Sequence, residues 1–415
     1  MNFLYNLLLS IVALLLPMVA LFNKKIQLFY KGRKETFSKL NSVSKTDKVI
    51  WFHAASLGEF EQGRPIIEEL KQRCSDYKIV VTFFSPSGYE IRKNYPLADV
   101  ICYVPLDTKS NVKKFLKQVH PTIAIMIKYE FWPNLLSGLK RQQIPTVLIS
   151  GIFRENQSFF KWYGSFMREK LTAFNHFFVQ NETSKNLLNS IEFHNVTIAG
   201  DTRFDRVYDI LQQDNSLDFI SAFKNNHYTV VAGSTWKDDE ELLVDYINNH
   251  ASENEKFIIA PHNIHQKQIK ELQDCINKKT ILYSEKEGKA LYDYQVFIID
   301  TIGLLTKIYS YADVACVGGG LKTNLHNILE PAVYGIPIVF GNKKYKKFQE
   351  AVDLLKLEGA IAIGTKKDFY TTFANLQSNP NLREKMGTTN FLYIENNIGA
   401  TSLILDYLKN IVANC

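Results

Sequence analysis

The chain has 415 residues, of which 46% are apolar and 22% are charged, and its formal net charge is +7. That length exceeds what one hydrophobic core usually serves, so two globular domains are expected. The charge is modest and no nucleic-acid-binding module is recognisable, which argues against a nucleic-acid partner. The five cysteines lack the spacing of metal ligands, which argues against structural zinc.

The N-terminal segment predicts a membrane helix. Phe3–Phe22 is almost entirely apolar and is interrupted only by Tyr5, Asn6, Ser10 and Pro17. About 20 helical residues span about 30 Å, the thickness of a bilayer core. No small-residue cleavage site follows, so residues 1–23 are expected to form an uncleaved single-pass anchor and not a signal peptide. A buried or interfacial helix is the alternative, which Asn6 and Pro17 favour.

Basic residues crowd the segment after this apolar run. They are Lys24, Lys25, Lys31, Arg33, Lys34 and Lys39. Such a cluster favours a surface of anionic lipid. Because positive charge stays on the cytoplasmic side of a membrane, the rest of the chain is expected in the cytoplasm.

Short apolar, β-branched runs recur through the rest of the chain, with helix-like segments between them. In the first half the predicted strands are Lys48–His53, Lys78–Phe84, Val100–Val104, Thr122–Ile127, Thr146–Ile149, His176–Val179 and Val196–Ile198. In the second half they are Tyr228–Ala232, Phe257–Ala260, Thr280–Tyr283, Val296–Ile299, Val314–Val317, Ile336–Val339 and Ala360–Ile363. Strands that alternate with helices predict parallel sheets with crossover helices.

The two sets of strands predict two Rossmann-like, doubly wound α/β domains. The N-terminal domain is expected over residues 24–207, the linker over the polar residues 208–226, and the C-terminal domain over residues 227–415. For the last helix, which ends this range, packing back on the N-terminal domain is the alternative. In such folds ligands bind beyond the carboxyl ends of the strands, so the loops that leave the strands should carry the chemistry.

Glu59 follows the first predicted strand, which ends at His53. The intervening loop is rich in small residues that let the backbone approach a ligand, and Glu59 is expected in the first turn of the next helix. A carboxylate there is a candidate general base. It fits equally well a residue that only complements the helix dipole.

Two further charged residues follow strands of the first half. Glu130 lies among aromatic residues in Y-E-F-W-P-N, where low dielectric perturbs a carboxylate, and Lys128 is its candidate partner. Arg203, in G-D-T-R-F-D, is expected to face the cleft between the domains. A surface salt bridge is the alternative for Arg203.

The loop after the predicted strand Val314–Val317 contains three glycines, Gly318, Gly319 and Gly320. Glycines allow backbone N–H groups to approach a phosphate, so this is a candidate phosphate loop. A helix opened by Asn327 is expected next, with Glu330 placed to accept hydrogen bonds from a ribose. A glycine run alone also fits a tight turn, but together with H-N-x-x-E-P it is typical of a nucleotide-sugar site.

Two more loops follow strands of the second half: Pro261-His262, and D-T-I-G-L-L over Asp300–Leu305. Each is a candidate contact to a base or ribose. No D-x-D motif occurs in the chain, so neither a metal ion nor another cofactor is expected, and the charge of a leaving phosphate must be met by protein dipoles and cations.

These loops together resemble the transferases of 3-deoxy-D-manno-octulosonic acid (Kdo). The resemblance covers essentially the whole chain in order: the anchor, H-A-A-S-L-G-E, Y-E-F-W-P-N, G-D-T-R-F-D, the Gly-Ser-Thr of V-V-A-G-S-T-W, D-T-I-G-L-L, and G-G-G-L followed by H-N-I-L-E-P. It implies a GT-B fold, with the acceptor on the N-terminal domain and CMP on the C-terminal domain. It also implies transfer of Kdo from CMP-Kdo to the lipid A precursor, lipid IV-A, with inversion, on the cytoplasmic side of a Gram-negative inner membrane.

The resemblance assigns roles to individual residues. Glu59 matches the catalytic base, and Glu130 and Arg203 match two positions that stabilise the transition state. The positions that match the CMP site are Pro261, His262, Ile302, Gly303, Leu304, Asn327, Ile328, Leu329 and Glu330.

The chain departs from the family pattern at three positions. Arg203 stands where lysine is usual, which keeps the charge but changes its geometry. Asn263 follows Pro261-His262 where the family has Pro-Arg-His, and Leu304 replaces an acidic residue. The alternative function is that of another GT-B protein that acts on a UDP-sugar, as an envelope glycosyltransferase or an epimerase.

Overall fold

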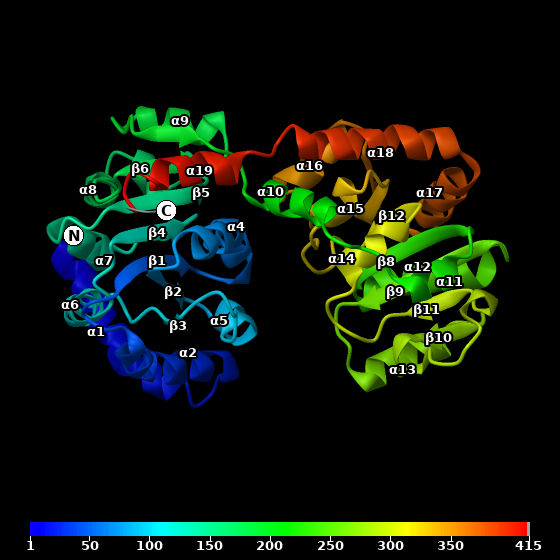
Figure 1. Ribbon diagram of the computed structural model, residues 1–415, viewed down its shortest axis with the longest axis horizontal. Coiled ribbons are helices and arrows are strands. Elements are labelled where there is room, and N and C mark those ends of the chain that lie inside the picture. The colour runs from blue at the N-terminus through cyan, green and yellow to red at the C-terminus, as the bar shows by residue number, and fades with distance from the viewer. Residues whose placement is uncertain (413–415) are drawn as a thin grey trace. The chain divides into compact units, whose positions relative to one another are not determined.

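The computed structural model describes residues 1–412. The chain folds into two compact units, which Figure 1 shows in ribbon form. Unit 1 comprises Met1–Asp205 together with the C-terminal residues from 397, and unit 2 comprises Arg206–Asn396.

Unit 1 is built on a seven-stranded parallel sheet with the order β3-β2-β1-β4-β5-β6-β7. Its strands are β1 (Lys48–Ala54), β2 (Tyr77–Phe83), β3 (Val100–Tyr103), β4 (Ile123–Ile127), β5 (Thr146–Gly151), β6 (His176–Val179) and β7 (Val196–Ile198). Its helices are α1 (Asn2–Val19), α2 (Lys24–Lys34), α3 (Thr36–Lys39), η1 (Leu40–Ser42), α4 (Leu57–Arg73), α5 (Pro86–Arg92), α6 (Lys109–Val119), α7 (Pro133–Arg141), η2 (Ser158–Phe160), α8 (Ser165–Leu171), α9 (Glu182–Asn189) and α19 (Ala400–Leu408). Because helices cover both faces, the strands are apolar on both sides and nearly all buried.

Unit 2 repeats this plan with the sheet order β10-β11-β9-β8-β12-β13-β14. Its strands are β8 (Tyr228–Thr235), β9 (Glu255–Pro261), β10 (Thr280–Leu282), β11 (Val296–Ile298), β12 (Val314–Val317), β13 (Ile338–Gly341) and β14 (Ala360–Ile363). Its helices are η3 (Asp209–Gln212), α11 (Asp218–Lys224), α12 (Lys237–Asn249), α13 (Gln266–Asp274), η4 (Tyr283–Glu285), η5 (Leu291–Asp293), α14 (Leu305–Ile308), η6 (Tyr309–Tyr311), α15 (Leu329–Val333), α16 (Gln349–Lys356), α17 (Lys366–Ser378) and α18 (Pro380–Glu395); α10 (Arg203–Tyr208) crosses the boundary of the units.

Every predicted strand overlaps an observed one, and the two doubly wound parallel sheets are confirmed. The differences lie at strand ends. The strand predicted from Ile336 begins at Ile338, after Pro337, which has no N–H to give to a sheet. The strand predicted to end at Ala232 continues to Thr235.

The segment 208–226, expected as a linker, contains η3 and α11 in the structure. Ile220 and Phe223 of α11 are fully buried against β8, β9 and β11. The boundary between the units lies earlier, after Asp205. At the other end of the chain, α19 returns to unit 1, where Ile404 and Leu408 join the core under β1, β4 and β6.

Helix α1 is long and apolar enough to cross a membrane, and its 18-residue window has a mean hydropathy of 2.0 with no buried residue. One face of the helix nevertheless contacts unit 1. The hydroxyl of Tyr5 donates to Asp107 at 2.7 Å, and the Asn134 amide donates to Asn6 at 2.9 Å. Two of the four residues that interrupt the apolar run, Tyr5 and Asn6, therefore bind the rest of the domain.

The basic segment after α1 is only partly available to lipid. Lys24, Lys25, Lys31 and Lys34 are exposed. Arg33 is buried, its guanidinium lies 3.4 Å from the centre of the Phe29 ring, and it donates to the carbonyl of Phe84 at 2.8 Å. Arg33 therefore does not belong to the exposed cluster predicted from the sequence, because its planar cation packs between aromatic rings.

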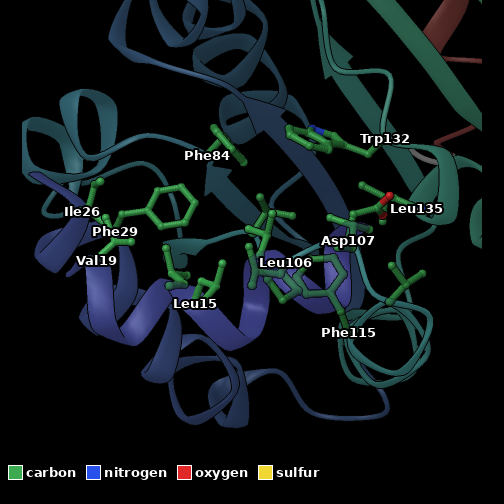
Figure 2. Close-up of a pocket in the computed structure, with 16 residues that line it drawn as sticks. Leu15, Val19, Ile26, Phe29, Phe84, Leu106, Asp107, Phe115, Trp132 and Leu135 are labelled. Atoms are coloured by element: carbon green, nitrogen blue, oxygen red, sulfur yellow. Dashed lines mark hydrogen bonds between the residues drawn. The ribbon is translucent and has the colours of Figure 1, made fainter. Parts of the chain in front are cut away.

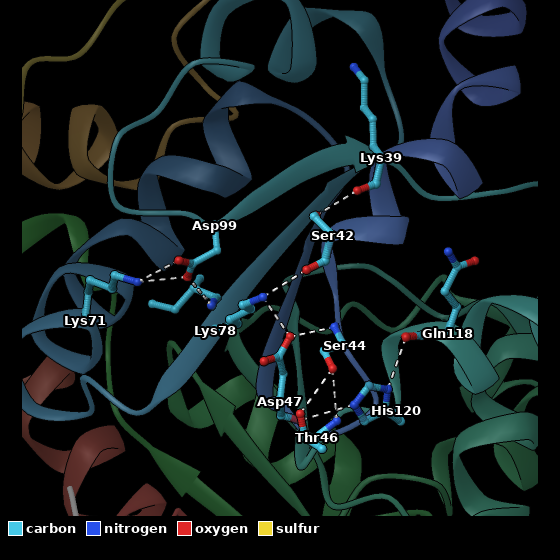
Figure 3. A network of polar contacts seen from close by, with 11 residues as sticks. Lys39, Ser42, Ser44, Thr46, Asp47, Lys71, Lys78, Asp99, Gln118 and His120 are labelled. Carbon is cyan, nitrogen blue, oxygen red and sulfur yellow. Dashed lines mark hydrogen bonds and ion pairs between the residues drawn. The ribbon is translucent and has the colours of Figure 1, made fainter.

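A polar network holds the amino ends of the strands of unit 1 (Figure 3). Asp47, just before β1, lies 2.7 Å from Lys78 of β2, and its carbonyl is 3.1 Å from His120 before β4. Asp99, just before β3, pairs with Lys71 at 2.8 Å. These contacts fasten the sheet at the end opposite to the loops that carry the predicted site residues.

Candidate active site

The predicted site residues gather where the strand order reverses. In unit 1, β1 lies between β2 and β4, so the loops after β1 and β4 leave the sheet side by side. In unit 2, β8 lies between β9 and β12 in the same way. Crevices at such points are the usual binding sites of doubly wound sheets.

Glu59 occupies the first turn of α4, as predicted. It is half-buried, and the hydroxyl of Ser56, the residue that precedes the helix, donates to its carboxylate. The charge of Glu59 also acts on Tyr129 of the loop after β4: burial raises the pKa of the Tyr129 hydroxyl and Glu59 raises it further, while Arg154 opposes both. Glu59 therefore lies near the second of the predicted loops.

Glu130 is buried beneath this surface, with 4% of its side chain exposed. Its Oε2 accepts a hydrogen bond from the Trp132 indole at 2.7 Å and lies 2.7 Å from Nε2 of His53, at the end of β1. His53 is fully buried, and its Nδ1 lies 2.9 Å from the hydroxyl of Thr82. A chain of close polar contacts thus joins β2, β1 and the loop after β4.

Lys128 is not the partner of Glu130 that the sequence predicts. The contacts of Glu130 are with His53 and Trp132, because the adjacent strand β1 brings an imidazole closer than the neighbouring lysine. Lys128 has a φ of 71°, which is strained for a residue with a side chain, and its charge acts on Asp201.

Arg203 is tied to Asp201, which is 6% exposed. Nε and a terminal nitrogen of Arg203 donate to the same carboxylate oxygen at 2.9 and 2.7 Å, and Gln62 of α4 adds a third donor at 3.0 Å. Burial by itself would raise the pKa of Asp201, but the charge and hydrogen bonds of Arg203 hold that pKa below its usual value. Arg203 is therefore held on a buried carboxylate that also binds Gln62, which lies three residues after Glu59 on α4.

In unit 2 three rings stack at the ends of β8, β9 and β12. Trp236 and His262 lie 4.5 Å apart and nearly parallel, and His262 and His326 also lie 4.5 Å apart. The Trp236 indole donates to Nε2 of His326 at 2.8 Å. Burial, and then the neighbouring His262, lower the pKa of His326 to about 4, so this ring is neutral near pH 7 with its proton on Nδ1.

Glu330 lies in the first turn of α15, four residues after His326. Its carboxylate accepts hydrogen bonds from Thr306 at 2.9 Å and from Asn327 at 3.1 Å. The helix expected to open at Asn327 begins at Leu329, because the Asn327 side chain accepts from the backbone of Leu329 and the residues before it stay outside the helix. Ile328 and Leu329 are buried and anchor this turn.

The prediction that Gly318, Gly319 and Gly320 offer their N–H groups to a phosphate is not supported. All three donate within unit 2: Gly318 to Gly233 at 2.8 Å, Gly319 to Asp239 at 2.8 Å, and Gly320 to Thr323 at 3.0 Å. The glycines are needed for close packing instead. Gly319 and Gly320 have φ near +80°, and a Cβ on either would clash with a backbone oxygen.

The remaining residues predicted to bind CMP lie at or after the ends of β9 and β11 of the same sheet. Pro261 ends β9, and the N–H of His262 donates to Thr235 at 2.9 Å. Ile302 is 82% exposed, Gly303 has a φ of 95°, and Leu304 directly precedes α14, which carries Thr306. The loops after β8, β9, β11 and β12 therefore meet at one edge of the unit 2 sheet.

Several residues of these sites were not singled out from the sequence. His53 lies in the motif H-A-A-S-L-G-E and Asp201 in G-D-T-R-F-D. The sequence marked each of them by its position near the end of a predicted strand. The sequence marked Trp236 only as the residue after Gly-Ser-Thr, and His326 only as the first residue of H-N-x-x-E. In the aromatic run S-F-F-K-W-Y-G, Phe159 is buried but Trp162 is 91% exposed.

Comparisons with known proteins bear on the fold and on the related families. Residues 31–206 match the family model of 3-deoxy-D-manno-octulosonic-acid transferase (kdotransferase). A 3-deoxy-D-manno-octulosonic acid transferase from Rickettsia felis is 29% identical over 84% of this chain and 76% of its own, and one from Haemophilus influenzae is 24% identical over 87% and 86%. A UDP-GlcNAc 2-epimerase from Neisseria meningitidis, 16% identical, shares the fold with a TM-score of 0.60 over 88% of this chain and 100% of its own.

The sequence relatives and the two parallel-sheet units lead to the same assignment. The chain is a glycosyltransferase of the GT-B fold class and is similar to the Kdo transferases, whose family model matches residues 31–206.

Proposed function

We propose that the protein transfers Kdo from CMP-Kdo to the lipid A precursor lipid IV-A, with inversion and without a metal ion. The observation that carries the proposal is the meeting of the Glu59 loop with the buried His53–Glu130 pair at the reversal point of the unit 1 sheet. A carboxylate at a helix start, beside a strained loop, suits a general base.

In the proposed reaction Glu59 takes the proton from a glucosamine hydroxyl of the lipid. The oxygen attacks the anomeric carbon of Kdo as the bond to CMP breaks, so the configuration inverts. The hydroxyl of Ser56 orients the Glu59 carboxylate. Arg203, held by Asp201, offsets negative charge on the leaving phosphate or on the Kdo carboxylate.

Glu130 is assigned a positioning role in this proposal. Its carboxylate is buried and occupied by His53 and Trp132, so it acts on the reaction through the loop that it holds. This refines the expectation, taken from the family resemblance, that Glu130 stabilises the transition state directly.

Unit 2 is assigned the CMP moiety. Glu330, already oriented by Thr306 and Asn327, accepts hydrogen bonds from the ribose. His262 is exposed on one side of the ring stack and offers a flat surface to the base. The turn at Ile302–Leu304 contributes backbone groups.

The membrane partner is assigned to α1 and to the exposed lysines of α2. The outer face of α1 is apolar and exposed, and the cations of Lys24, Lys25, Lys31 and Lys34 suit anionic headgroups. The proposed location is the inner membrane, with both units on the cytoplasmic side.

Transfer of radiolabelled Kdo from CMP-Kdo to lipid IV-A, with the product analysed by mass, tests the proposal. Glu59→Gln should lose about 10²–10⁴-fold in rate because a general base contributes that much. It should still show a thermal shift with CMP. Normal transfer by folded Glu59→Gln would contradict the role of Glu59, and no transfer by the wild type would contradict the reaction.

Use of a UDP-sugar is the alternative. The same thermal-shift measurement with CMP, UDP and UMP separates the two, because stabilisation by a ligand grows with its concentration over its Kd. A larger shift with the uridine nucleotides would favour the alternative.

A further inference from the structure

An apolar pocket lies between α1 and the body of unit 1, and no step of the proposed reaction uses it (Figure 2). Its volume is about 480 Å³. The lining comes from α1, α2, the end of β3 and the starts of α6 and α7, and it includes Leu16, Phe29, Leu106 and Phe115. A pocket of this size is in the range of ordinary small-molecule sites.

The lining excludes a polar ligand. Among the residues that line the pocket, Asp107 is the only ionisable one. Both oxygens of its carboxylate are occupied, one by the backbone N–H of Leu135 at 2.8 Å and the other by Tyr5 at 2.7 Å and the backbone N–H of Asn134 at 2.9 Å. An apolar cavity offers water no partners. The natural occupant is therefore hydrocarbon.

The mouth of the pocket opens beside the membrane helix. Val12, Leu15 and Val19 of α1 line the pocket and are also each more than 40% exposed, so they form its rim. The outer face of the same helix is apolar and exposed, and lipid is the phase that suits it. A chain that leaves the bilayer beside α1 can enter the pocket without crossing water.

The inner wall of the pocket reaches the candidate active site. Phe84 and Trp132 line it and stack on each other with ring centres 4.7 Å apart. The indole N–H of Trp132 donates to Glu130 at 2.7 Å. A ligand in the pocket therefore contacts Trp132, which binds Glu130 in the loop near Glu59.

We propose that this pocket holds one hydrocarbon chain of the lipid acceptor, which orients the sugar headgroup of that lipid toward the Trp132 end. The proposal rests on the proposed function, because a sugar nucleotide has no hydrocarbon chain whereas an acylated acceptor has several. Binding of the chain would select acylated acceptors over free sugars.

A pair of variants on one helix tests the pocket. Leu16→Trp fills it, whereas Leu14→Trp puts the same side chain on the outer face of α1, where Leu14 is 78% exposed and does not line the pocket. Both variants keep α1 apolar, so membrane association should match. Thermal unfolding in detergent with and without CMP verifies that both are folded.

Kinetics with two acceptors give the first measurement. Leu16→Trp should raise the KM for the acylated acceptor about tenfold or more, because an acyl chain that buries even two fewer methylene groups in the pocket binds about tenfold more weakly. The KM for a fully deacylated, water-soluble acceptor should not change, and Leu14→Trp should resemble the wild type with both. Equal effects of the two variants, or an equal KM increase for the deacylated acceptor, would overturn the proposal.

Photolabelling gives a second measurement that needs no activity. A straight-chain fatty acid with a terminal diazirine should label wild type and Leu14→Trp at Leu106–Phe115, and Leu16→Trp much less. Labelling that is unchanged in Leu16→Trp would overturn the pocket assignment. Failure of the proposed function looks different: the wild type would then transfer Kdo to neither acceptor, whatever the labelling shows.

Discussion

The carboxylate of Glu130 lies 2.7 Å from Nε2 of His53, although the two residues are 77 positions apart in the chain: His53 lies on β1 and Glu130 in the loop that follows the neighbouring strand β4. Both side chains are buried, and each has a second polar partner: Trp132 for Glu130 and Thr82 for His53. A buried chain of this kind holds a loop in one geometry, because each member would leave another unsatisfied if it moved.

Removal of the Glu130 carboxylate should therefore reduce both stability and transfer. Glu130→Ala leaves the indole N–H of the half-buried Trp132 and Nε2 of the buried His53 without this partner, which should cost about 1–3 kcal/mol for each group left unsatisfied. Glu130→Gln keeps one acceptor oxygen and should unfold nearer to the wild type while still losing activity. Guanidinium unfolding in detergent and the Kdo transfer assay measure the two effects.

A matched control for Glu130 is Glu69→Ala, in the exposed pair of Glu69 with Arg73 on α4. Exposed pairs contribute little, so its stability should stay within about 0.5 kcal/mol. If Glu130→Ala matched this control, the buried chain would not hold the loop.

Arg203 should be more important for stability than a surface ion pair. Arg203→Ala leaves the buried Asp201 with neutral donors alone, the side chains of Gln62 and Gln180 and the backbone N–H of residue 203, and the expected loss lies at the low end of about 3–5 kcal/mol. Arg203→Lys keeps the charge but not the two hydrogen bonds, so it should lose less.

The loss in Arg203→Ala should depend on pH. Because the pKa of Asp201 is lowered in the folded protein, its pair with Arg203 stabilises above the unfolded pKa of about 4 and is lost as pH falls through the folded pKa. Unfolding free energies of wild type and variant should therefore differ most near pH 7 and converge in acid. A difference that does not change with pH would contradict the assignment.

Glu330→Gln should weaken CMP binding. The carboxylate is held by Thr306 and Asn327, and hydrogen bonds to a charged acceptor contribute about 1.5–3 kcal/mol, so the Kd for CMP should rise about tenfold or more. Titration calorimetry with CMP measures this. The exposed Glu253→Gln, also in unit 2, is the control, and an unchanged Kd in Glu330→Gln would remove Glu330 from the ribose site.

Asp107 should make unit 1 less stable as pH rises. Burial raises its pKa to about 6, although Tyr5, the N–H groups of Asn134 and Leu135, and His53 all favour the charged form. A group with a raised pKa contributes stability below its unfolded pKa of about 4, which is lost as pH rises through about 6. A pKa difference of about 2 corresponds to about 3 kcal/mol.

Asp107→Asn removes this dependence because the amide does not ionise. Between pH 5 and pH 7.5 the unfolding free energy of the wild type should therefore fall relative to that of Asp107→Asn, as followed by thermal unfolding in detergent. A parallel pH profile of the two proteins would contradict the raised pKa.

The sequence by itself determined the two parallel sheets and the loops that carry the sites. Strands buried on both faces must be continuously apolar, so β1, β4, β8 and β12 stand out between polar helices. The order of motifs along the chain also predicted Glu59, Arg203 and Glu330 as site residues.

Only the tertiary structure decided which groups are partners. His53 rather than Lys128 meets Glu130, Asp107 meets Tyr5 of the N-terminal helix, and the N–H groups of Gly318–Gly320 are used inside unit 2. The physical reason is that a hydrogen bond is decided within a few tenths of an ångström, by strand order and loop path. Apolar periodicity shows which faces of an element are buried, but it gives neither the order of the strands nor the path of the loops.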